Sequence, residues 1–337
     1  MNTVHCSAPG RCGIIGNPTD MYGGSVISCT IPFRARVTIE PWDCLEVVTS
    51  GQTKRFASRD DLELQDDLFD VARAVLGYLH DDRLACRITY TSDVPMSSGV
   101  SSSTALLVAL VFGLMRFQGN HAHLYTVAEV ARYIELNHFR IVCGYQDAYM
   151  CTFGGLYYMD FRNKQFYRQA AEELYATVES LLPFVRELPF VLAHSGVRHS
   201  SDAVHKPLRE RWLEGDPAVR QGYEEIARLA QEGKKALLNR DWARLGELMN
   251  RNHAIQRDLG GSGDSNERLI RAALDAGALG AKLAGAGGGG TIIALHPEPE
   301  ALMAVLAAAG SERVFQPRPC PGVCLDEDFD RLAAAMA

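Results

Sequence analysis

One glycine and a row of hydroxyl side chains stand directly before an apolar run. Residues 95–105 read Pro-Met-Ser-Ser-Gly-Val-Ser-Ser-Ser-Thr-Ala, and the run from Ala105 to Met115 predicts a buried helix. The first turn of a helix presents unpaired N–H groups and the positive end of the helix dipole, which together bind anions. One or two hydroxyls suffice for capping, whereas residues 101–104 are all Ser or Thr. We therefore predict a phosphate site here, with a serine hydroxyl available to Mg²⁺.

A second glycine-rich segment, residues 284–290, contains Gly-x-Gly-x-x-Gly from Gly285 to Gly290. In a dinucleotide-binding unit that spacing follows a strand and opens a helix. Here the β-branched residues Thr291-Ile292-Ile293 follow instead and predict a strand. The context argues against a dinucleotide site, and a glycine hinge between two closely approaching strands is the residue-level alternative.

Two further segments place charged side chains among turn residues. Arg11 and Asp20 lie within residues 8–24, between several glycines and prolines, and Asp147 comes shortly after Gly144. Loops of this composition commonly carry binding groups. Taken alone, Asp147 fits a helix cap better than a catalyst.

The elements that must position these segments alternate between strand and helix patterns. Short β-branched runs predict strands at 36–40, 45–49, 86–91, 155–161, 190–193, 281–283 and 291–296. Helical spacing predicts helices at 66–79, from 103 to about 117, and at 127–136, 202–212, 217–238, 241–257, 265–276 and 300–309, with a last helix after Asp326. Strands, then long helices, then strands again predict an α+β protein with two lobes, 1–188 and 189–337.

Composition argues against several other classes of protein. The chain has 337 residues with 34 Lys and Arg against 41 Asp and Glu, so its net charge of -7 provides no overall positive field for nucleic acid. No apolar run approaches the ~20 residues that span a bilayer, and residues 1–15 lack the pattern of an export signal. The 9 cysteines are scattered, and the spacing of Cys320 and Cys324 lacks further zinc ligands. We expect a cytoplasmic protein with no nucleic-acid or membrane partner.

Together, in order and spacing, the four segments resemble the motifs of the GHMP kinases, a family named for galactokinase, homoserine kinase, mevalonate kinase and phosphomevalonate kinase. Residues 95–105 are similar to the family's P-x3-G-L-x-S-S-A loop, with Val100 for Leu and Thr104 for Ala. Residues 282–290 look like its C-terminal glycine motif, and residues 144–155 like its sugar-kinase segment. The resemblance implies an N-terminal lobe of the ribosomal-protein S5 domain 2 type and a ferredoxin-like C-terminal lobe with extra helices.

The resemblance also implies roles for individual residues, with ATP as phosphoryl donor and Mg²⁺ as metal. Asp147 and Arg11 would be catalytic, and Asp147 would orient the acceptor hydroxyl and accept its proton. Ser102 or Ser103 would ligate the metal together with Glu135. The phosphates would be held by Pro95, Ser97, Ser98, Gly99, Val100, Ser101, Ser102, Ser103 and Thr104. The acceptor would contact Asn17, Asp20, Tyr22, Gly144, Asp147, Arg198 and Gly287.

Position 17 bears on the choice of acceptor, because galactokinase has Gly-Glu-His-x-Asp-Tyr where this chain has Gly-Asn-Pro-Thr-Asp-Met-Tyr (residues 16–22). A pocket without that carboxylate favours an acceptor that carries one. The segments 16–22, 143–161 and 204–257 resemble glucuronokinases, which phosphorylate the anomeric hydroxyl of D-glucuronate, whereas residues 194–199 resemble heptose kinases. The sequence thus predicts a sugar 1-kinase for glucuronate, as monomer or homodimer. A heptose or heptose-phosphate kinase and an inactive sugar-binding regulator are the alternatives.

Overall fold

The computed structural model describes residues 2–79, 84–96, 98–162, 164, 174–197, 201–285 and 287–336, without the side chains of 201–206. A long, bent strand organises its first lobe. This strand is β2 (Ser25–Pro41), and β1 (Val4–Ile15) runs antiparallel beside it. The sheet has the order β12-β1-β2-β5-β3-β4, with β6 pairing the first half of β2 and β7 pairing β6. The other strands are β3 (Leu45–Thr49), β4 (Gln52–Phe56), β5 (Cys86–Ser92), β6 (Leu156–Asp160), β7 (Thr177–Ser180) and β12 (Cys324–Leu325).

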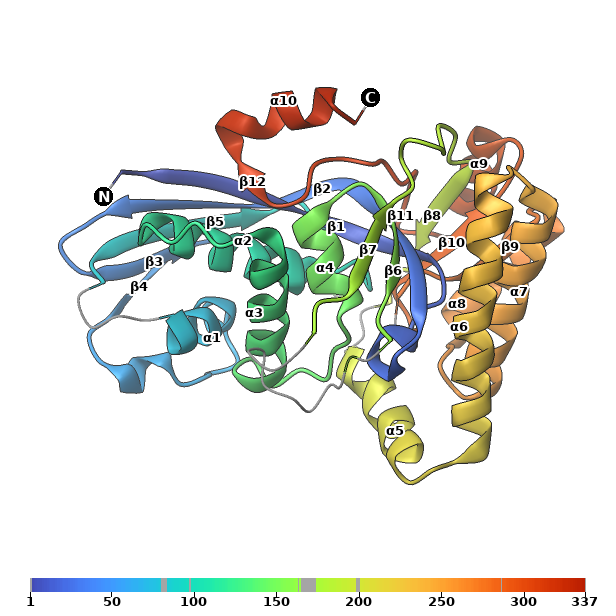
Figure 1. The fold of residues 1–337 in the computed structure, drawn as a ribbon, viewed down its shortest axis with the longest axis horizontal. Helices are drawn as coiled ribbons and strands as arrows, with labels where there is room; N and C mark the ends of the chain where they lie inside the picture. The colour runs from blue at the N-terminus through green and yellow to red at the C-terminus, as the bar shows by residue number, and fades with distance from the viewer. Residues whose placement is uncertain are drawn as a thin grey trace.

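Helices of the first lobe pack along one side of this sheet (Figure 1). Their bounds are α1 (Asp70–Leu79), α2 (Ser102–Phe117), α3 (Leu124–Asn137) and α4 (Gln146–Phe153), with short 3-10 turns at Thr19–Tyr22 and Arg59–Leu62. Helix α2 is apolar on nearly all sides because it lies between the sheet and the helices α1, α3 and α4. Because α2 is held in this buried position, the place of its N-terminus is fixed. The place of the serine-rich loop that leads into it, residues 95–104, is fixed as well.

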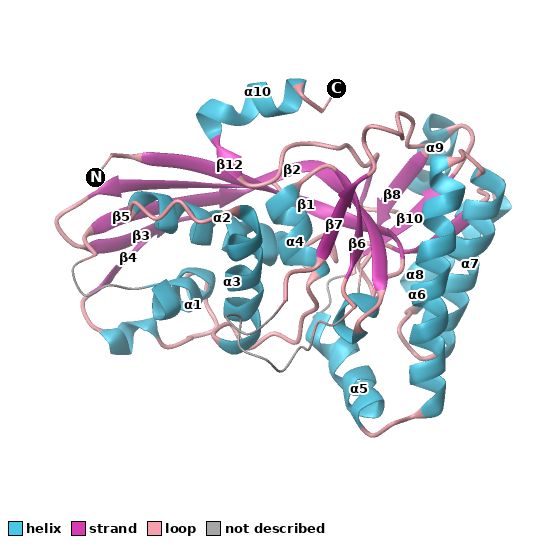
Figure 2. Cartoon of the chain, viewed as in Figure 1, coloured by secondary structure: helices cyan, strands magenta, loops and turns pink. Residues whose placement is uncertain are grey.

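The second lobe is built on a separate antiparallel sheet of order β11-β8-β10-β9. Its strands are β8 (Phe190–His194), β9 (Gly280–Leu283), β10 (Thr291–Leu295) and β11 (Arg313–Phe315). Its helices, gathered at one end of the molecule in Figures 1 and 2, are α5 (Ser201–Leu213), α6 (Pro217–Leu238), α7 (Trp242–Asp258), α8 (Asp264–Asp275) and α9 (Pro299–Ala308). Helices α8 and α9 cover this sheet, and α6 also packs on β1 and β2 and so joins the two lobes. The predicted two-lobed α+β fold is confirmed.

Two of the differences from the sequence expectation bear on how the chain is organised around the site. Residues 8–15, expected as part of a loop, belong to β1, because shifts of register at Pro9/Arg11 and Gly13/Ile15 accommodate the proline and the glycines within the strand. The C-terminal tail, assigned to the second lobe, returns to the first: β12 pairs with β1, and α10 (Phe329–Ala334) follows it. Strand β8 starts at Phe190, and the division at 188/189 stays a prediction.

Buried Arg34 fastens this returning tail. Its guanidinium donates to the carbonyl oxygens of Ser7, Pro321 and Gly322, so one side chain joins β1 to the tail. The 9 cysteines all lie in the described part of the chain and form no disulfide. Within the same part, no helix combines the length and the apolarity needed to cross a membrane.

Candidate active site

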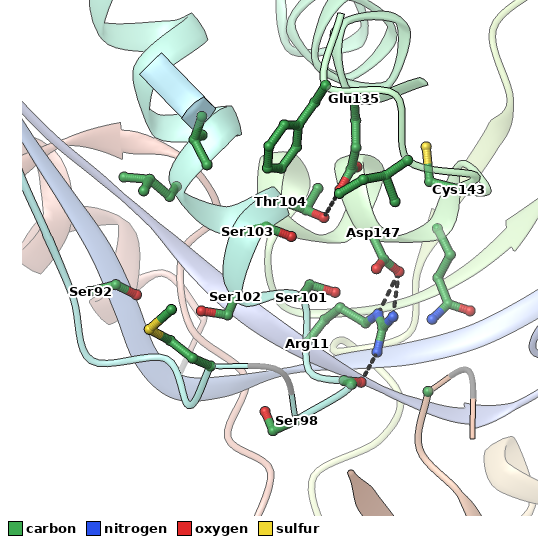
Figure 3. A pocket seen from close by; sticks show the side chains of 18 of the residues that line it. Arg11, Ser92, Ser98, Ser101, Ser102, Ser103, Thr104, Glu135, Cys143 and Asp147 are labelled. Carbon is green, nitrogen blue, oxygen red and sulfur yellow. Dashed lines mark hydrogen bonds and ion pairs between the residues drawn. The ribbon is translucent and has the colours of Figure 1, made fainter. Parts of the chain in front are cut away.

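Most of the predicted site residues in the described part of the chain line a cavity of about 830 Å³. Strand β1, the loop between β5 and α2, the N-terminus of α4 and Gly285 from the loop between β9 and β10 all contribute to its walls. Figure 3 shows the serine-rich loop facing Glu135 and Asp147 across this space. Its size falls in the range of small-molecule sites. Segments that the sequence analysis selected separately, from four parts of the chain, therefore meet at one place.

The serine-rich loop is held in shape by two of its own hydroxyls. Ser98 Oγ donates to the Pro95 carbonyl at 2.6 Å, and Ser102 Oγ donates to the Val94 carbonyl at 3.2 Å. The backbone of Val100 is also held in place, because its carbonyl oxygen accepts a hydrogen bond from the backbone N–H of Arg11 at 3.1 Å. Two of the predicted phosphate ligands therefore have structural contacts already. Ser97 lies outside the described residues.

Hydroxyls of Ser101 and Ser103 face the cavity instead (Figure 3). Ser101 caps α2 with a left-handed backbone (φ 65°), and its buried Oγ has no partner among the described residues. Nor does the described part of the chain offer the Ser103 hydroxyl a hydrogen bond. The Ser102 hydroxyl turns to the other side, toward Ser92. Together with the unpaired N–H groups of the first turn of α2, Ser101 and Ser103 form a donor surface suited to phosphate.

Glu135, near the end of α3, is a buried carboxylate that is only half satisfied. Its Oε1 accepts from Thr104 Oγ1 at 2.8 Å, whereas Oε2 has no partner in the described residues. Burial, with repulsion from Asp147, raises the pKa of Glu135 to about 7. A buried acid with an unused oxygen facing a hydroxyl-lined cavity fits a site for a divalent cation. The described residues contain no group of three or more His, Cys, Asp or Glu, so substrate phosphate would have to complete the coordination.

Arg11 and Asp147 form an ion pair at the centre of the cavity (Figure 3). Arg11 Nε and Nη2 both reach Asp147 Oδ1, at 2.7 and 2.5 Å, and Nη1 donates to the Gly99 carbonyl at 2.8 Å. The Arg11 side chain is 7% exposed and that of Asp147 29% exposed, so the pair faces the cavity through the carboxylate. Burial alone would lower the pKa of Arg11, but the Asp147 carboxylate outweighs this and the pKa rises. The ion pair thus holds the Asp147 side chain in a fixed place.

Beside Asp147, Asp20 anchors the N-terminus of α4. Its Oδ2 accepts the backbone N–H groups of Tyr145 and Gln146 at 2.8 and 2.9 Å. Burial raises the pKa of Asp20, and these two hydrogen bonds offset part of the rise. Gly144 is required by this contact, since a Cβ there would lie 1.8 Å from Asp20 Oδ2. The predicted ligand Asp20 therefore lines the cavity and also sets the position of the helix that carries Asp147.

Two predicted acceptor ligands in the described part of the chain, Tyr22 and Gly287, do not line the cavity with the others. Tyr22 stacks on Tyr223 with ring centroids 4.6 Å apart and also contacts Trp212. Gly287 packs on the loop after α7, where a Cβ would lie 1.8 Å from the Gly261 carbonyl oxygen. Arg198 lies outside the described residues. The assignments of Tyr22, Gly287 and Arg198 stay predictions, and the first two have packing contacts that explain their residue types.

Other cavity residues were not anticipated from the sequence. Gln146 is buried, lines the cavity next to Asp147, and has an Oε1 without a partner in the described part of the chain. Beyond the serine-rich loop the lining becomes more apolar and is formed by Thr49, Ser50, Leu68, Val71, Tyr90, Leu106, Phe139 and Ile141. These residues carry no motif, because their positions depend on how β3, β5, α1 and the end of α3 pack.

Comparison with known proteins agrees with this geometry. Residues 68–155 match the GHMP kinases N terminal domain, residues 234–313 the GHMP kinases C terminal domain, and residues 2–41 the galactokinase galactose-binding signature. Glucuronokinase 1 of Arabidopsis thaliana is 31% identical over 96% of this chain and 94% of its own length. A mevalonate kinase of Pyrococcus horikoshii is 29% identical over 91% of this chain and 93% of its own length.

Solved structures share the fold at lower identity. Lactococcus lactis galactokinase complexed with galactose superposes with a TM-score of 0.78 at 17% identity, covering 96% of this chain and 95% of that one. A D-glycero-D-manno-heptose 1-phosphate kinase from Bacteriodes thetaiotaomicron gives a TM-score of 0.71 at 22% identity, covering 95% and 97%. The similarity in sequence to glucuronokinase 1 and the matched domains over both lobes lead to one conclusion: the chain belongs to the GHMP kinase family.

Proposed function

We propose that this protein is a sugar kinase that transfers the γ-phosphoryl group of ATP to the anomeric hydroxyl of D-glucuronate. The observation that carries the proposal is the Arg11–Asp147 pair, with a partly exposed carboxylate next to a loop whose free hydroxyls and helix N-terminus suit a phosphate. Phosphoryl transfer depends mainly on alignment of the two substrates and on neutralisation of charge. Each requirement has a matching group in the cavity.

The nucleotide would occupy the half of the cavity beside the serine-rich loop. The N–H groups at the start of α2 and the hydroxyls of Ser101 and Ser103 would hold its phosphates. The more apolar lining around Leu68, Val71 and Phe139 suits the base, which needs contact area rather than charge.

Ser103 and Glu135 fit a Mg²⁺ ion shared with these phosphates. Glu135 Oε2 has no other partner among the described residues, and Ser103 is favoured over Ser102, whose hydroxyl already donates to Val94. When bound, the cation would neutralise charge that develops on the transferring phosphoryl group. Thr104 would keep Glu135 turned toward the ion through its hydrogen bond to Oε1.

In the transfer step, the acceptor oxygen forms a bond to the γ-phosphorus while the bond from that phosphorus to the β–γ bridging oxygen breaks. Asp147 takes the proton of the acceptor hydroxyl. An anomeric hydroxyl is more acidic than an ordinary alcohol, so a carboxylate needs only to orient it and accept the proton late. Arg11 holds Asp147 in place through the ion pair, and its buried charge would also stabilise the transferring oxygens.

Glucuronate is favoured as acceptor by four observations. Glucuronokinase 1 is similar over nearly the whole chain, and residues 2–41 match a galactose-binding signature. The mevalonate kinase also acts, by its name, on an acid. Position 17 carries an amide where the galactokinase motif has a carboxylate. These point to a sugar with a carboxylate of its own.

A panel of acceptors tests this proposal. ADP release is measured with D-glucuronate, D-galacturonate, D-glucose, D-galactose, mevalonate and a heptose phosphate, and the product is located by ³¹P NMR. We expect the highest kcat/KM with D-glucuronate, phosphate on C1, and a loss of about 10³-fold for Asp147→Asn. Asp258→Asn, at an exposed ion pair, is the matched control and should keep normal turnover.

Other results would overturn specific parts of the proposal. A preference for the heptose phosphate would establish the alternative acceptor. Binding of a sugar without any ADP release would establish an inactive sugar-binding protein. Near-normal turnover of Asp147→Asn would remove the proton-acceptor role from that residue.

A further inference from the structure

Behind Asn17 lies a buried lysine that no part of the proposed transfer step uses. Lys282, on β9, is fully buried, and its Nζ donates to Asn17 Oδ1 at 2.7 Å and to the Leu283 carbonyl. Both partners are neutral oxygens. Among the described residues, the titratable groups that act on it are Arg11 and Cys12 of β1 and His253 of α7, none of which is a carboxylate. A buried ammonium without a counter-ion lowers the stability of the folded protein, so its presence here needs an explanation.

The contacts of Asn17 fix the direction of its amide. Lys282 can only donate, so the atom facing it must be Oδ1, and the Gly285 carbonyl can only accept, so the atom 3.1 Å from it must be Nδ2. Both ends give the same orientation. Asn17 also lines the cavity, and its oxygen is turned away toward Lys282 and Gly13. The remaining Nδ2 proton is therefore the polar group that Asn17 offers to an acceptor molecule.

We propose that Lys282 and Asn17 act as one specificity device that selects an acceptor carrying a carboxylate. Asn17 donates an N–H to the carboxylate of the acceptor. The ammonium of Lys282, on the other side of the Asn17 amide, polarises that amide and acts as the counter-ion of the carboxylate. Lys282 is here a positioning and electrostatic residue, since Asn17 stands between it and the cavity. This inference rests on the proposed function, because it concerns how the same cavity chooses its acceptor.

Electrostatics supports the arrangement. Burial lowers the pKa of Lys282 to about 7, as expected for an ammonium that faces only neutral oxygens and the like charge of Arg11. A carboxylate at position 17 would neutralise the ammonium internally, and the pocket would then repel an acidic acceptor. With the amide, the Lys282 ammonium has no counter-ion until such an acceptor binds, and the carboxylate of the acceptor then favours the protonated form of Lys282.

The decisive variant is Asn17→Asp, which has the same shape and places a carboxylate against Lys282. D-Glucuronate and D-glucose are compared as acceptors, since they differ only in the carboxylate at C6. We expect the ratio of kcat/KM for glucuronate over glucose to fall about tenfold or more, through a higher KM for glucuronate. Lys282→Gln, which keeps a donor and removes the charge, should move the ratio in the same direction.

Asn250→Asp is the matched control. Asn250, on α7, also bonds the backbone of β9, through Ala281 N and the Leu279 carbonyl, without touching Lys282. It should leave the ratio unchanged, and thermal melting confirms that each variant is folded.

The outcomes separate two failures. A wild-type protein that phosphorylates another acceptor and no uronate overturns the proposed function, and this inference with it. A wild-type protein that uses glucuronate, with a ratio that Asn17→Asp leaves unchanged or that Asn250→Asp moves equally, overturns the inference alone.

Discussion

Replacing Lys282 with methionine should change how the stability of the protein depends on pH. Lys282 is fully buried, and its pKa is lowered from 10.5 to about 7 by burial. Between these two values the unfolded chain binds a proton at this position and the folded chain does not. Stability therefore rises with pH in this window, by up to about 1.4 kcal/mol per pH unit, and the full destabilisation is present below pH 7.

The magnitude follows from the two pKa values. Because the folded-state proton is lost gradually around pH 7, the free energy of unfolding gains about 1.5 kcal/mol from this residue between pH 7 and 8.5, and changes little below pH 6. Lys282→Met cannot titrate. It also leaves Asn17 Oδ1 and the Leu283 carbonyl without their donor, which lowers stability by an amount independent of pH.

Urea unfolding of both proteins at pH 6, 7, 8 and 8.5, under reducing conditions, measures this difference. Subtracting the variant from the wild type cancels groups that titrate in both, including cysteines such as Cys86, whose pKa burial raises to about 12. The difference should grow with pH, and the ammonium-neutralising Asn17→Asp should flatten the wild-type slope. A difference that stays constant from pH 6 to 8.5 would refute the reasoning, because it would mean that the buried ammonium is already compensated.

Two more substitutions test the scaffold of the site. Gly144→Ala places a Cβ 1.8 Å from Asp20 Oδ2. We therefore expect the free energy of unfolding, measured with urea, to fall by about 2 kcal/mol and the KM for the acceptor to rise. Unchanged values would mean that α4 can shift without cost. Thr104→Ala removes the hydrogen bond to Glu135 Oε1, so the affinity for Mn²⁺ in the presence of a nucleotide should fall about tenfold, as measured by electron paramagnetic resonance. Thr104→Ser should bind Mn²⁺ normally. Equal affinities in the wild type and both variants would show that Thr104 does not position Glu135.

Local chemistry made several elements predictable. Helix α6 spans Pro217–Leu238, as expected, because Asp216 caps its first turn and Pro217 is suited to its first position. Helix α2 begins at Ser102, where the hydroxyl run meets the apolar run. In such segments each residue's local preference agrees with its tertiary surroundings, so a short window of sequence is enough.

Pairings across the chain were much less predictable. Arg11 was expected in a loop because proline and glycine surround it, yet it lies on β1, where the register shifts absorb those residues. Its ion pair with Asp147 joins positions 136 apart in sequence, and the link from Lys282 to Asn17 spans 265. Neither pairing leaves a periodic signal. Motif resemblance suggested the first, and only the folded chain revealed the second.

Gly285 shows why the two interpretations of the glycine-rich segment were both incomplete. As a hinge it was expected to let strands approach, and as a family motif it was expected to serve the substrates. A Cβ at Gly285 would lie 2.3 Å from the Gly99 carbonyl oxygen, the same oxygen that accepts Arg11 Nη1. The Gly285 carbonyl in turn accepts Asn17 Nδ2. The missing side chain thus lets the second lobe pack against the serine-rich loop, and this contact helps to hold both the Arg11–Asp147 pair and the amide of Asn17.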